Sequence, residues 1–482
     1  MNVNLLSTVA LASHWLIVVG LSLRVVNRRR PVGVSLAWLA VIFSVPFAGA
    51  LLYLLLGEQR IGRGRMARTV AHVNDLRRWQ ATLKAPAEAT SPAASLLYGP
   101  LGEQAERVLG YPAIPGNAIT VLGDANSVFD EMVRDINGAK STCNVCFYIW
   151  HEGGRAAEVV EALVRATRRG VRCRALADAV GSKAFLTGPQ ASRLRHAGVH
   201  LRAALPTSLF RAIFVRADLR NHRKIVVIDG RVAYTGSQNM VDPRFFKQDA
   251  GVGEWIDAMA RIVGPAAAAL DGVFALDWAV EHNQAFEPPP VWRGSPRDQG
   301  ASVVQVAPSG PDLHPEAIHQ LLLTAIYSAR HDLTLTTPYF VPDDSILTAL
   351  LSAALRHVEV TLIVPARSDS LPIRYASTAH FDALMTAGAR IYLFHGGLLH
   401  TKSMSIDDGV GVVGSVNLDM RSLWLNFEIS LFVYDPSFNA RLRTLHDGYL
   451  AQSERLDLAT WRRRPALQQF LEDVFRLLGP LL

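Results

Sequence analysis

An internal repeat constrains this chain more than any other feature of its sequence. The pattern H-x-K-x-x-x-x-D occurs twice, beginning at His222 and at His400. A G-S-x-N loop follows each copy, beginning at Gly236 and at Gly414, so patterns and loops repeat at the same separation. One copy of so short a pattern arises by chance, but two copies with matched loops indicate two related halves. The candidate site residues are His222, Lys224, Asp229, Ser237 and Asn239 in the first half and His400, Lys402, Asp407, Ser415 and Asn417 in the second.

The surrounding sequence predicts an α/β fold for both halves. A strand at Gly170–Leu176 has its counterpart at His357–Ile363, and helical stretches precede them at Ala156–Arg169 and Leu347–Arg356. Strands that alternate with helices are typical of α/β/α layers, so we expect a largely parallel sheet in each half. We expect the two halves to pack as a pseudo-dimer. Their predicted bounds are residues 111–290 and 291–482.

Two long apolar stretches open the chain. Leu5–Leu23 and Val32–Leu56 contain no Asp, Glu, Lys or Arg, and a helix of about 20 residues crosses a bilayer core of about 30 Å. We therefore expect residues 1–57 to form a transmembrane helical hairpin, in which Pro46 is tolerated as a kink. Basic residues follow both stretches, so the positive-inside rule does not choose the orientation of this hairpin.

The segment between the apolar stretches and the repeat, residues 58–110, is predicted to be a linker with some helix. Within it, Ala85–Pro100 is rich in Ala, Pro and Ser, which is typical of a flexible joint.

Charge and cysteine content narrow the function only slightly. The formal net charge is +7, which suits anionic partners such as nucleic acid, phosphate esters or acidic lipid headgroups. Three cysteines are too few for a disulfide framework. Cys143 and Cys146 lie in an apolar strand, and no second Cys or His pair completes a metal site, so we expect buried thiols. No metal and no cofactor is expected.

The sequence around the repeated pattern predicts where its side chains point. Asn221–Ile228 is apolar and β-branched, which indicates a buried strand. His222 and Lys224 are two residues apart and should project from the same face of that strand. Asp229 directly precedes Gly230 at a turn, and the second copy ends in Asp407, Asp408 and Gly409, so we assign both pattern aspartates a structural role.

Two histidines and two lysines suit chemistry at a phosphodiester. A neutral imidazole can attack phosphorus and form a phosphohistidine, and a second, protonated imidazole can donate to the leaving alcohol. Lys224, Lys402, Asn239 and Asn417 can hold the non-bridging oxygens as negative charge builds. This chemistry requires no metal, and the pattern has no carboxylate cluster of the kind that binds Mg²⁺.

Long strings around both copies resemble the phospholipase D superfamily, whose signature is this duplicated pattern, and within it the bacterial cardiolipin synthases. The resemblance covers nearly the whole chain, including the two apolar stretches. The strings are Arg220–Gly230, Gly253–Asp257, Thr337–Asp343, Gly396–Lys402 and Asn417–Glu428.

The resemblance implies one active site at the interface of two α/β/α halves. It implies that His222 is the nucleophile and His400 the general acid and base. It also implies that a carboxylate downstream of each pattern orients the histidine of the other half, setting its tautomer. The candidates are Glu254 downstream of the first pattern and Glu428 downstream of the second, at similar spacings.

The reaction implied by the resemblance joins two phosphatidylglycerol molecules into cardiolipin and glycerol through a phosphohistidine. The resemblance also implies a multi-pass protein of the bacterial inner membrane, whose partners are phospholipid and bilayer and not nucleic acid. Residues 206–219, which could instead be a buried loop, and residues 277–292 are candidates for the face that contacts lipid.

Three other functions stay open on the sequence alone. A hydrolytic phospholipase D would use the same residues and release phosphatidic acid. A nuclease of the superfamily would suit the basic charge, but the apolar stretches argue against it and no aromatic-rich pattern for single strands stands out. A catalytically silent membrane scaffold is disfavoured because both H-x-K pairs are intact.

Overall fold

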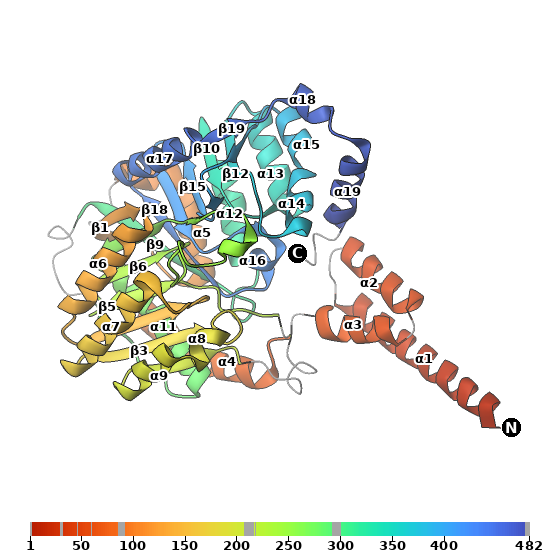
Figure 1. Cartoon of the computed structure of the whole chain (residues 1–482), viewed down its shortest axis with the longest axis horizontal. Coiled ribbons are helices and arrows are strands. Elements are labelled where there is room, and N and C mark those ends of the chain that lie inside the picture. Colours follow the sequence, from red (N-terminus) through yellow and green to blue (C-terminus); the bar gives the residue numbers. More distant parts are fainter. Residues whose placement is uncertain are drawn as a thin grey trace. The chain divides into compact units, whose positions relative to one another are not determined.

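The structure is a computed structural model that describes residues 2–28, 32–45, 47–58, 60–84, 92–206, 216, 218–291 and 300–477. The chain separates into two compact units, and Figure 1 shows its course through both. The small unit comprises residues 1–64 and 207–219, and the large unit comprises residues 65–206 and 220–482.

Apolar helices form the body of the small unit. These are α1 (Asn2–Asn27), α2 (Val32–Ser44) and α3 (Ala48–Leu56). Residues 7–27 of α1 are long and apolar enough to cross a membrane, and they form the single such span among the described residues.

The second apolar stretch is not one continuous helix, which corrects the expectation from the sequence. It forms α2, with 13 residues, and α3, with 9. At 1.5 Å per residue these helices span about 20 Å and about 14 Å, less than a bilayer core of about 30 Å. Pro46 stands between them in the sequence, where it supplies no N–H to a helix; the predicted kink at Pro46 itself lies outside the described residues.

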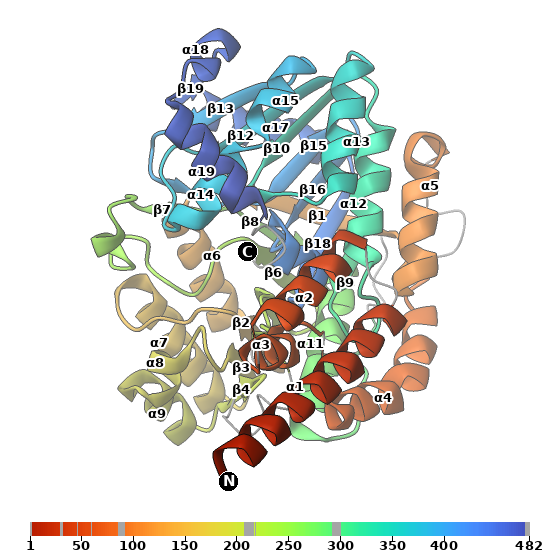
Figure 2. The same cartoon turned by 90° about the vertical axis from the view of Figure 1, so that its right-hand side faces the viewer.

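One mixed sheet of 15 strands forms the centre of the large unit, in the order β19-β13-β12-β10-β15-β16-β18-β9-β1-β8-β6-β5-β2-β3-β4. The strands on either side of the β9–β1 pair repeat one arrangement, to which the second half adds β19 at its edge, and Figure 2 shows the second half (cyan and blue) continuing into the first. The strands of the first half are β1 (Ile114–Leu122), β2 (Thr142–Phe147), β3 (Arg172–Asp178), β4 (His200–Ala204), β5 (Ile225–Ile228), β6 (Val232–Gly236), β7 (Trp255–Ile256) and β8 (Met259–Val263). Those of the second half are β9 (Ser302–Ser309), β10 (Asp332–Thr336), β11 (Phe340–Val341), β12 (Glu359–Pro365), β13 (Arg390–Phe394), β14 (Leu398–Leu399), β15 (Ser403–Ile406), β16 (Val410–Gly414), β17 (Leu418–Asp419), β18 (Glu428–Tyr434) and β19 (Ser453–Arg455).

The prediction of a largely parallel sheet is wrong. Within the large sheet, the parallel pairs are β2–β3, β3–β4, β10–β12 and β12–β13, and the remaining pairs are antiparallel. The cause lies at the end of each repeated pattern. Asp229 and Asp407 adopt positive φ angles of 54° and 46° in tight turns, and these turns join β5 to β6 and β15 to β16. A tight turn joins antiparallel strands, whereas parallel strands need a long crossover.

Helices cover both faces of the first half of the sheet. α6 (Ala125–Gly138) and α7 (Gly154–Arg168) share a hydrophobic cluster with Cys143, whereas α11 (Ala266–His282) shares another cluster with Cys146. The two thiols therefore face opposite layers, and all three cysteines are buried and free, which confirms the prediction of buried thiols. The other helices of the large unit are α8 (Lys183–Thr187), α9 (Pro189–His196), α12 (Ala317–Ser328), α13 (Asp344–Leu355), α14 (Leu371–Thr378), α15 (Phe381–Thr386), α16 (Met420–Trp424), α17 (Pro436–Leu450), α18 (Leu458–Arg462) and α19 (Ala466–Leu477).

Much of the predicted linker is packed helix, namely α4 (Arg63–Ala81) and α5 (Pro92–Leu109). α5 contains residues 92–100 of the predicted flexible joint, whose residues 85–91 lie outside the described part. Leu101, Ala105 and Leu109 recur every four residues and are buried, so one stripe of α5 joins the core. That burial outweighs the local Pro and Ser content.

Candidate active site

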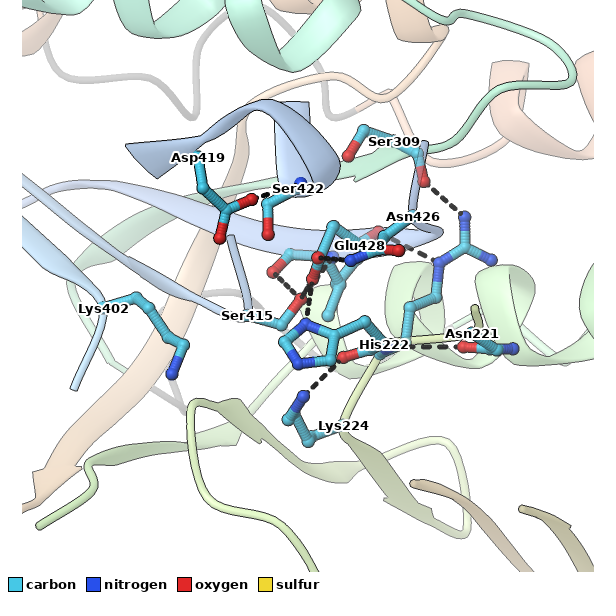
Figure 3. A network of polar contacts seen from close by, with 12 residues as sticks. Asn221, His222, Lys224, Ser309, Lys402, Ser415, Asp419, Ser422, Asn426 and Glu428 are labelled. Carbon is cyan, nitrogen blue, oxygen red and sulfur yellow. Dashed lines mark hydrogen bonds and ion pairs between the residues drawn. The ribbon is translucent and has the colours of Figure 1, made fainter. Parts of the chain in front are cut away.

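The backbone of one half holds His222 of the other half in place. The strand β5 begins only at Ile225, so the predicted strand over Asn221–Ile228 is shorter than expected at its start. The pairing of β5 with β2 ends at Ile225, which lies opposite Cys146. Instead, the His222 N–H donates to the carbonyl of Phe427 at 2.8 Å. The next residue, Glu428, lies with Oε2 at 2.8 Å from His222 Nδ1 (Figure 3).

His400 has the same arrangement with the roles of the halves exchanged. The His400 N–H donates to the carbonyl of Ile256 at 2.8 Å. The next residue, Asp257, lies with Oδ1 at 2.7 Å from His400 Nδ1. Each half therefore supplies a histidine and the carboxylate for the histidine of its neighbour. Because Nδ1 faces a carboxylate in both cases, Nε2 is the nitrogen left for substrate.

The placement of Glu254 corrects its predicted role. Glu254 is exposed, and Asp257 makes the contact to His400 in its place. The spacing misled the prediction because the stretch from the loop serine to the carboxylate is longer in the first half, Ser237 to Asp257, than in the second, Ser415 to Glu428. In the sheet, Met259 of β8 pairs with Gly236 and Ser430 of β18 pairs with Gly414, so Asp257 and Glu428 each stand two residues before equivalent positions.

The two loop serines hold the carboxylates. The Ser415 hydroxyl donates to Glu428 Oε2 at 2.5 Å, and the Ser237 hydroxyl donates to Asp257 Oδ1 at 2.6 Å. Each serine N–H donates in turn to the carbonyl of the residue that follows the carboxylate. The G-S-x-N loops therefore fix the two carboxylates rather than contact the substrate through the serines.

The two loop asparagines differ in their contacts. Asn239 accepts a hydrogen bond from the Ile149 N–H through Oδ1 at 3.1 Å. Its Nδ2 is buried without a partner among the described residues, so this amide can donate to a phosphate oxygen. Asn417 hydrogen-bonds through its side chain to Asp419. The predicted oxygen-holding role stays a prediction for both.

The two lysines are buried, and their electrostatic effects extend across both halves. Lys224 Nζ donates to the His222 carbonyl at 2.7 Å, and Lys402 Nζ donates to the His400 carbonyl at 2.5 Å. Each ammonium has three N–H groups, and among the described residues one of them donates to this carbonyl, so the others can donate to a substrate. Figure 3 shows Lys224 bonded to the His222 carbonyl and Lys402 of the other half in the same region; the charges of both lysines lower the pKa of His222.

The two motif aspartates lie at the far end of strands β5 and β15 from the histidines. Asp229 accepts backbone N–H bonds from residues 140–142, at the start of β2. Asp407 accepts them from residues 330–332, at the start of β10. These bonds tie neighbouring strands together, which is a structural task.

Burial controls the charge of the site. Burial lowers the pKa of both His222 and His400 to about 4; the carboxylates oppose this shift and the lysines of both halves add to it. Burial also lowers the pKa of Lys224 to about 8 and that of Lys402 to about 7. Burial would raise the pKa of Asp257, but His400 and Lys402 outweigh it and bring it to about 2. Before substrate binds, the imidazoles are therefore neutral and the carboxylates ionised at neutral pH.

Tyr148, Trp255 and Arg223 also contribute to the site, although the sequence did not predict them. The Tyr148 ring packs edge-on against His222 with a centroid distance of 4.8 Å, and the Trp255 ring packs on His400 at 4.3 Å. Arg223 is buried and donates to Asp277 at 2.5 Å and to the carbonyls of Glu428 and Ser309. Arg223 could have been found from the sequence, because it stands between His222 and Lys224 of the motif. Tyr148 and Trp255 could not, because neither has a fixed spacing from a motif residue.

The predicted lipid-contact segments have different outcomes. Most of residues 206–219 lies outside the described part. Asp277 and Trp278 are buried in α11, so the first part of residues 277–292 is core and not a lipid-contact surface. Among the described residues, no three His, Cys, Asp or Glu side chains are grouped closely enough to hold a metal ion.

Family models match both the repeat and the apolar start of the chain. The description "Cardiolipin synthase, PLD-like domain" matches residues 132–257 and again residues 322–447. "Phospholipase_D-nuclease N-terminal" matches residues 15–58.

Named relatives match over nearly the full length of the chain. Cardiolipin synthase A of Yersinia pseudotuberculosis serotype O:1b (strain IP 31758) and of Yersinia pestis are each 44% identical over 481 residues, which covers 99% of this chain and 99% of theirs. Among solved structures, the crystal structure of phosphatidylserine synthase from Haemophilus influenzae Rd KW20 has a similar fold, with a TM-score of 0.59 and 15% identity. That similarity covers 79% of this chain and 99% of the other.

Proposed function

The chain belongs to the cardiolipin synthases, phosphatidyltransferases of the phospholipase D superfamily, and from this premise we propose that it joins two phosphatidylglycerol molecules into cardiolipin and glycerol. The observation that carries the proposal is the exchange of carboxylates between the halves. Because Glu428 holds His222 and Asp257 holds His400, two imidazoles with free Nε2 atoms serve one site. A two-step transfer needs one nucleophile and one acid and base.

In the first step, Nε2 of neutral His222 attacks phosphorus of the first phosphatidylglycerol. The new N–P bond forms as the P–O bond to glycerol breaks, and His400 gives its proton to the leaving glycerol oxygen. His400 has a low pKa in the empty site, so it requires the phosphodiester anion nearby to become protonated. Lys224 and Lys402 neutralise the oxygens as charge builds.

In the second step, His400 removes a proton from the free hydroxyl of the second phosphatidylglycerol. The resulting oxygen attacks the phosphohistidine, the N–P bond breaks, and His222 returns to its neutral form. Both histidines end as they began, and the balance is two phosphatidylglycerols to one cardiolipin and one glycerol. Attack by water in this step would instead yield phosphatidic acid.

The product distribution tests the reaction. The purified chain would be reconstituted in phosphatidylglycerol vesicles with excess chelator, and the lipids resolved by mass spectrometry. We expect cardiolipin and an equal amount of released glycerol. Phosphatidic acid as the sole product would instead assign a hydrolase, and activity that returns only with added divalent metal would contradict the metal-free route.

A donor with a good leaving group tests which histidine is the nucleophile. With phosphatidyl-p-nitrophenol the first step needs no acid, so His400→Asn should still release nitrophenol in a burst of about one per enzyme. His222→Asn should give no burst, because the N–P bond cannot form. A burst from His222→Asn and none from His400→Asn would reverse the assignment.

We place the enzyme at the bacterial inner membrane, anchored by α1. The predicted multi-pass arrangement would require the second apolar stretch to cross the bilayer as well, and this depends on how α2 and α3 lie beside α1.

A further inference from the structure

A buried ionic cluster brings the end of α3 to the end of α1. Glu58, which follows α3, is only 3% exposed. It accepts hydrogen bonds from Arg24 in the last turn of α1 at 2.5 and 2.7 Å, from Tyr53 at 2.9 Å and from Arg60 at 3.1 Å. The chain therefore leaves the helical region at the same end at which α1 finishes.

The bend between α2 and α3 lies at the middle of α1. The ring of His14 is 5.3 Å from that of Phe47, and the ring of Trp15 is 6.4 Å from that of Phe43. α3 thus runs from the level of His14 to the level of Arg24, in the same direction as α1. α2 runs the opposite way, and both lie beside the carboxyl-terminal half of α1 (Figure 1).

The lengths of the helices show how far α2 and α3 would reach into a bilayer. From Trp15 to Asn27 α1 rises about 18 Å, and α2 with 13 residues rises about 20 Å. The pair therefore reaches roughly two thirds of the way into a core of about 30 Å. A chain that crossed fully would leave Glu58 near the amino end of α1, away from Arg24.

Backbone hydrogen bonds make the bend between α2 and α3 compatible with a hydrocarbon environment. Backbone N–H groups that lack a partner are costly there, and around the bend those of Val45, Gly49 and Leu51 donate to carbonyls four residues earlier. A Cβ at Gly49 would lie 2.1 Å from the Val41 carbonyl oxygen, so only glycine allows α2 and α3 to approach this closely.

The outer surface of the three helices is apolar. Large side chains such as Leu16, Leu36, Phe43 and Leu51 are each more than half exposed. A groove of about 420 Å³ between α1 and α3 is lined entirely by apolar residues and glycine. Such exposed surfaces fit hydrocarbon and not water.

We propose that α1 is the single crossing helix, that α2 and α3 form a re-entrant pair entering and leaving the bilayer on one face, and that this face is cytoplasmic. The side follows from charge. Arg24 lies in the last turn of α1 and three more arginines (28, 29 and 30) come after it; four others (60, 63, 65 and 68) come after α3, whereas residues 2–8 carry no Lys or Arg. A hairpin that crossed twice would put these clusters on opposite sides. The re-entrant pair puts both on one side, where the positive-inside rule applies.

Thiol labelling of the full chain tests this arrangement without reference to turnover, so its outcome is separate from that of the proposed reaction. The three native cysteines are buried, which keeps the background low. Single variants Asn2→Cys, Asn27→Cys and Arg63→Cys would be treated with a membrane-impermeant maleimide in intact spheroplasts and again after permeabilisation. The unaltered chain is the control.

We expect Asn2→Cys to react in intact spheroplasts, and Asn27→Cys and Arg63→Cys to react only after permeabilisation. If positions 2 and 63 were labelled under the same condition and position 27 under the other, the chain would cross the membrane twice, and the proposal would be overturned. Labelling of positions 27 and 63 from outside would overturn the cytoplasmic side. Protection of position 2 together with the other two would overturn the crossing by α1.

A depth measurement tests the bend directly. A fluorophore attached at Val45→Cys should be quenched most by lipids that carry the quencher midway along the acyl chain. A matched label at Arg63→Cys should be quenched most by a headgroup quencher. Headgroup quenching at both positions would mean that α2 and α3 lie on the surface, and would overturn the re-entrant pair.

Discussion

At the scale of single residues, the site pairs two histidines with unlike carboxylates. Glu428 reaches His222 at 2.8 Å and Asp257 reaches His400 at 2.7 Å. Each carboxylate also accepts a hydrogen bond from a loop serine, so its orientation is fixed before substrate arrives. A held carboxylate keeps one imidazole tautomer and stabilises the imidazolium.

Replacing Asp257 by Asn tests this role. An amide cannot stabilise the imidazolium of His400 as a carboxylate does, so we expect kcat to fall by about 10³ to 10⁴ with little change in KM. Glu254→Gln is the matched control, because Glu254 is exposed and three residues away; it should keep full activity. Loss of activity in Glu254→Gln, with Asp257→Asn unaffected, would restore the assignment made from spacing.

The pH dependence of kcat at saturating substrate, where the phosphodiester anion keeps His400 protonated, follows from the other buried groups. The nucleophile must be neutral, so activity should fall as the pH drops through about 4, the pKa of His222. The lysines must be charged, so activity should also fall as the pH rises through about 7 to 8, the pKa values of Lys402 and Lys224. A profile measured in vesicles should be bell-shaped between these limits, with values that belong to the coupled site. A rate that keeps rising above pH 9 would contradict the need for charged lysines.

The sequence predicted the motif residues and Glu428 but not Asp257, Tyr148 or Trp255. The motif residues repeat at a constant separation, which sequence alone displays. Asp257 was missed because a longer loop changed its spacing. The two rings approach the histidines only through the three-dimensional fold.

At the scale of elements, two short strands cross between the halves to position His400. β7 pairs with β14 in parallel, Trp255 beside Leu398 and Ile256 beside Leu399. Gly397 directly precedes β14 with φ of 134°, and a Cβ there would lie 2.4 Å from the Glu254 carbonyl oxygen. Glycine at this position therefore sets the distance between the halves.

Gly397→Ala should push β14 away from β7 and displace His400 from Asp257. A displacement of about 1 Å can lower the rate by about 10²-fold, so we expect a loss of that order in kcat. Gly388→Ala is the control: Gly388 has a φ of 104° but open space around its Cβ position. It should lose some thermal stability and retain its turnover. Equal kinetics in the two variants would argue against the positioning role of the crossing.

The elements themselves were predictable where hydrophobic periodicity was strong. The helix expected at Ala156–Arg169 is α7, Gly154–Arg168, and the strand expected at His357–Ile363 is β12, Glu359–Pro365. Strand direction was not predictable from alternation of strands and helices, because the hairpins after each motif reverse the chain. The break between α2 and α3 is visible in the sequence only as Pro46.

At the scale of the whole large unit, the two halves are joined by one continuous sheet and by the buried side chain of Arg223. β1 pairs with β9 at the centre. Arg223 of the first half donates to two carbonyls of the second, Ser309 and Glu428, while it pairs with Asp277 of its own half. The large unit should therefore unfold as a whole rather than half by half.

Arg223→Met should lower the free energy of unfolding by about 3 to 5 kcal/mol, because it leaves the Asp277 carboxylate buried without its cation. Thermal unfolding in detergent would measure this loss. The double variant Arg223→Met with Asp277→Leu removes both charges and should recover part of it. A single variant as stable as the parent would show that the cation contributes little to joining the halves.

The small unit contains two pieces of chain that are far apart in the sequence. Residues 207–219 belong to it together with residues 1–64, and the Arg216 N–H donates to the Arg60 carbonyl at 2.8 Å. Deleting the chain up to Gly64 would therefore remove the partner of Arg216, and the apolar residues Leu209, Phe210, Ile213 and Phe214 stand just before Arg216 in the sequence. Such a truncated protein should remain prone to aggregation and detergent-dependent. A water-soluble form of the enzyme would need both pieces removed, and the second ends at Leu219, just before His222.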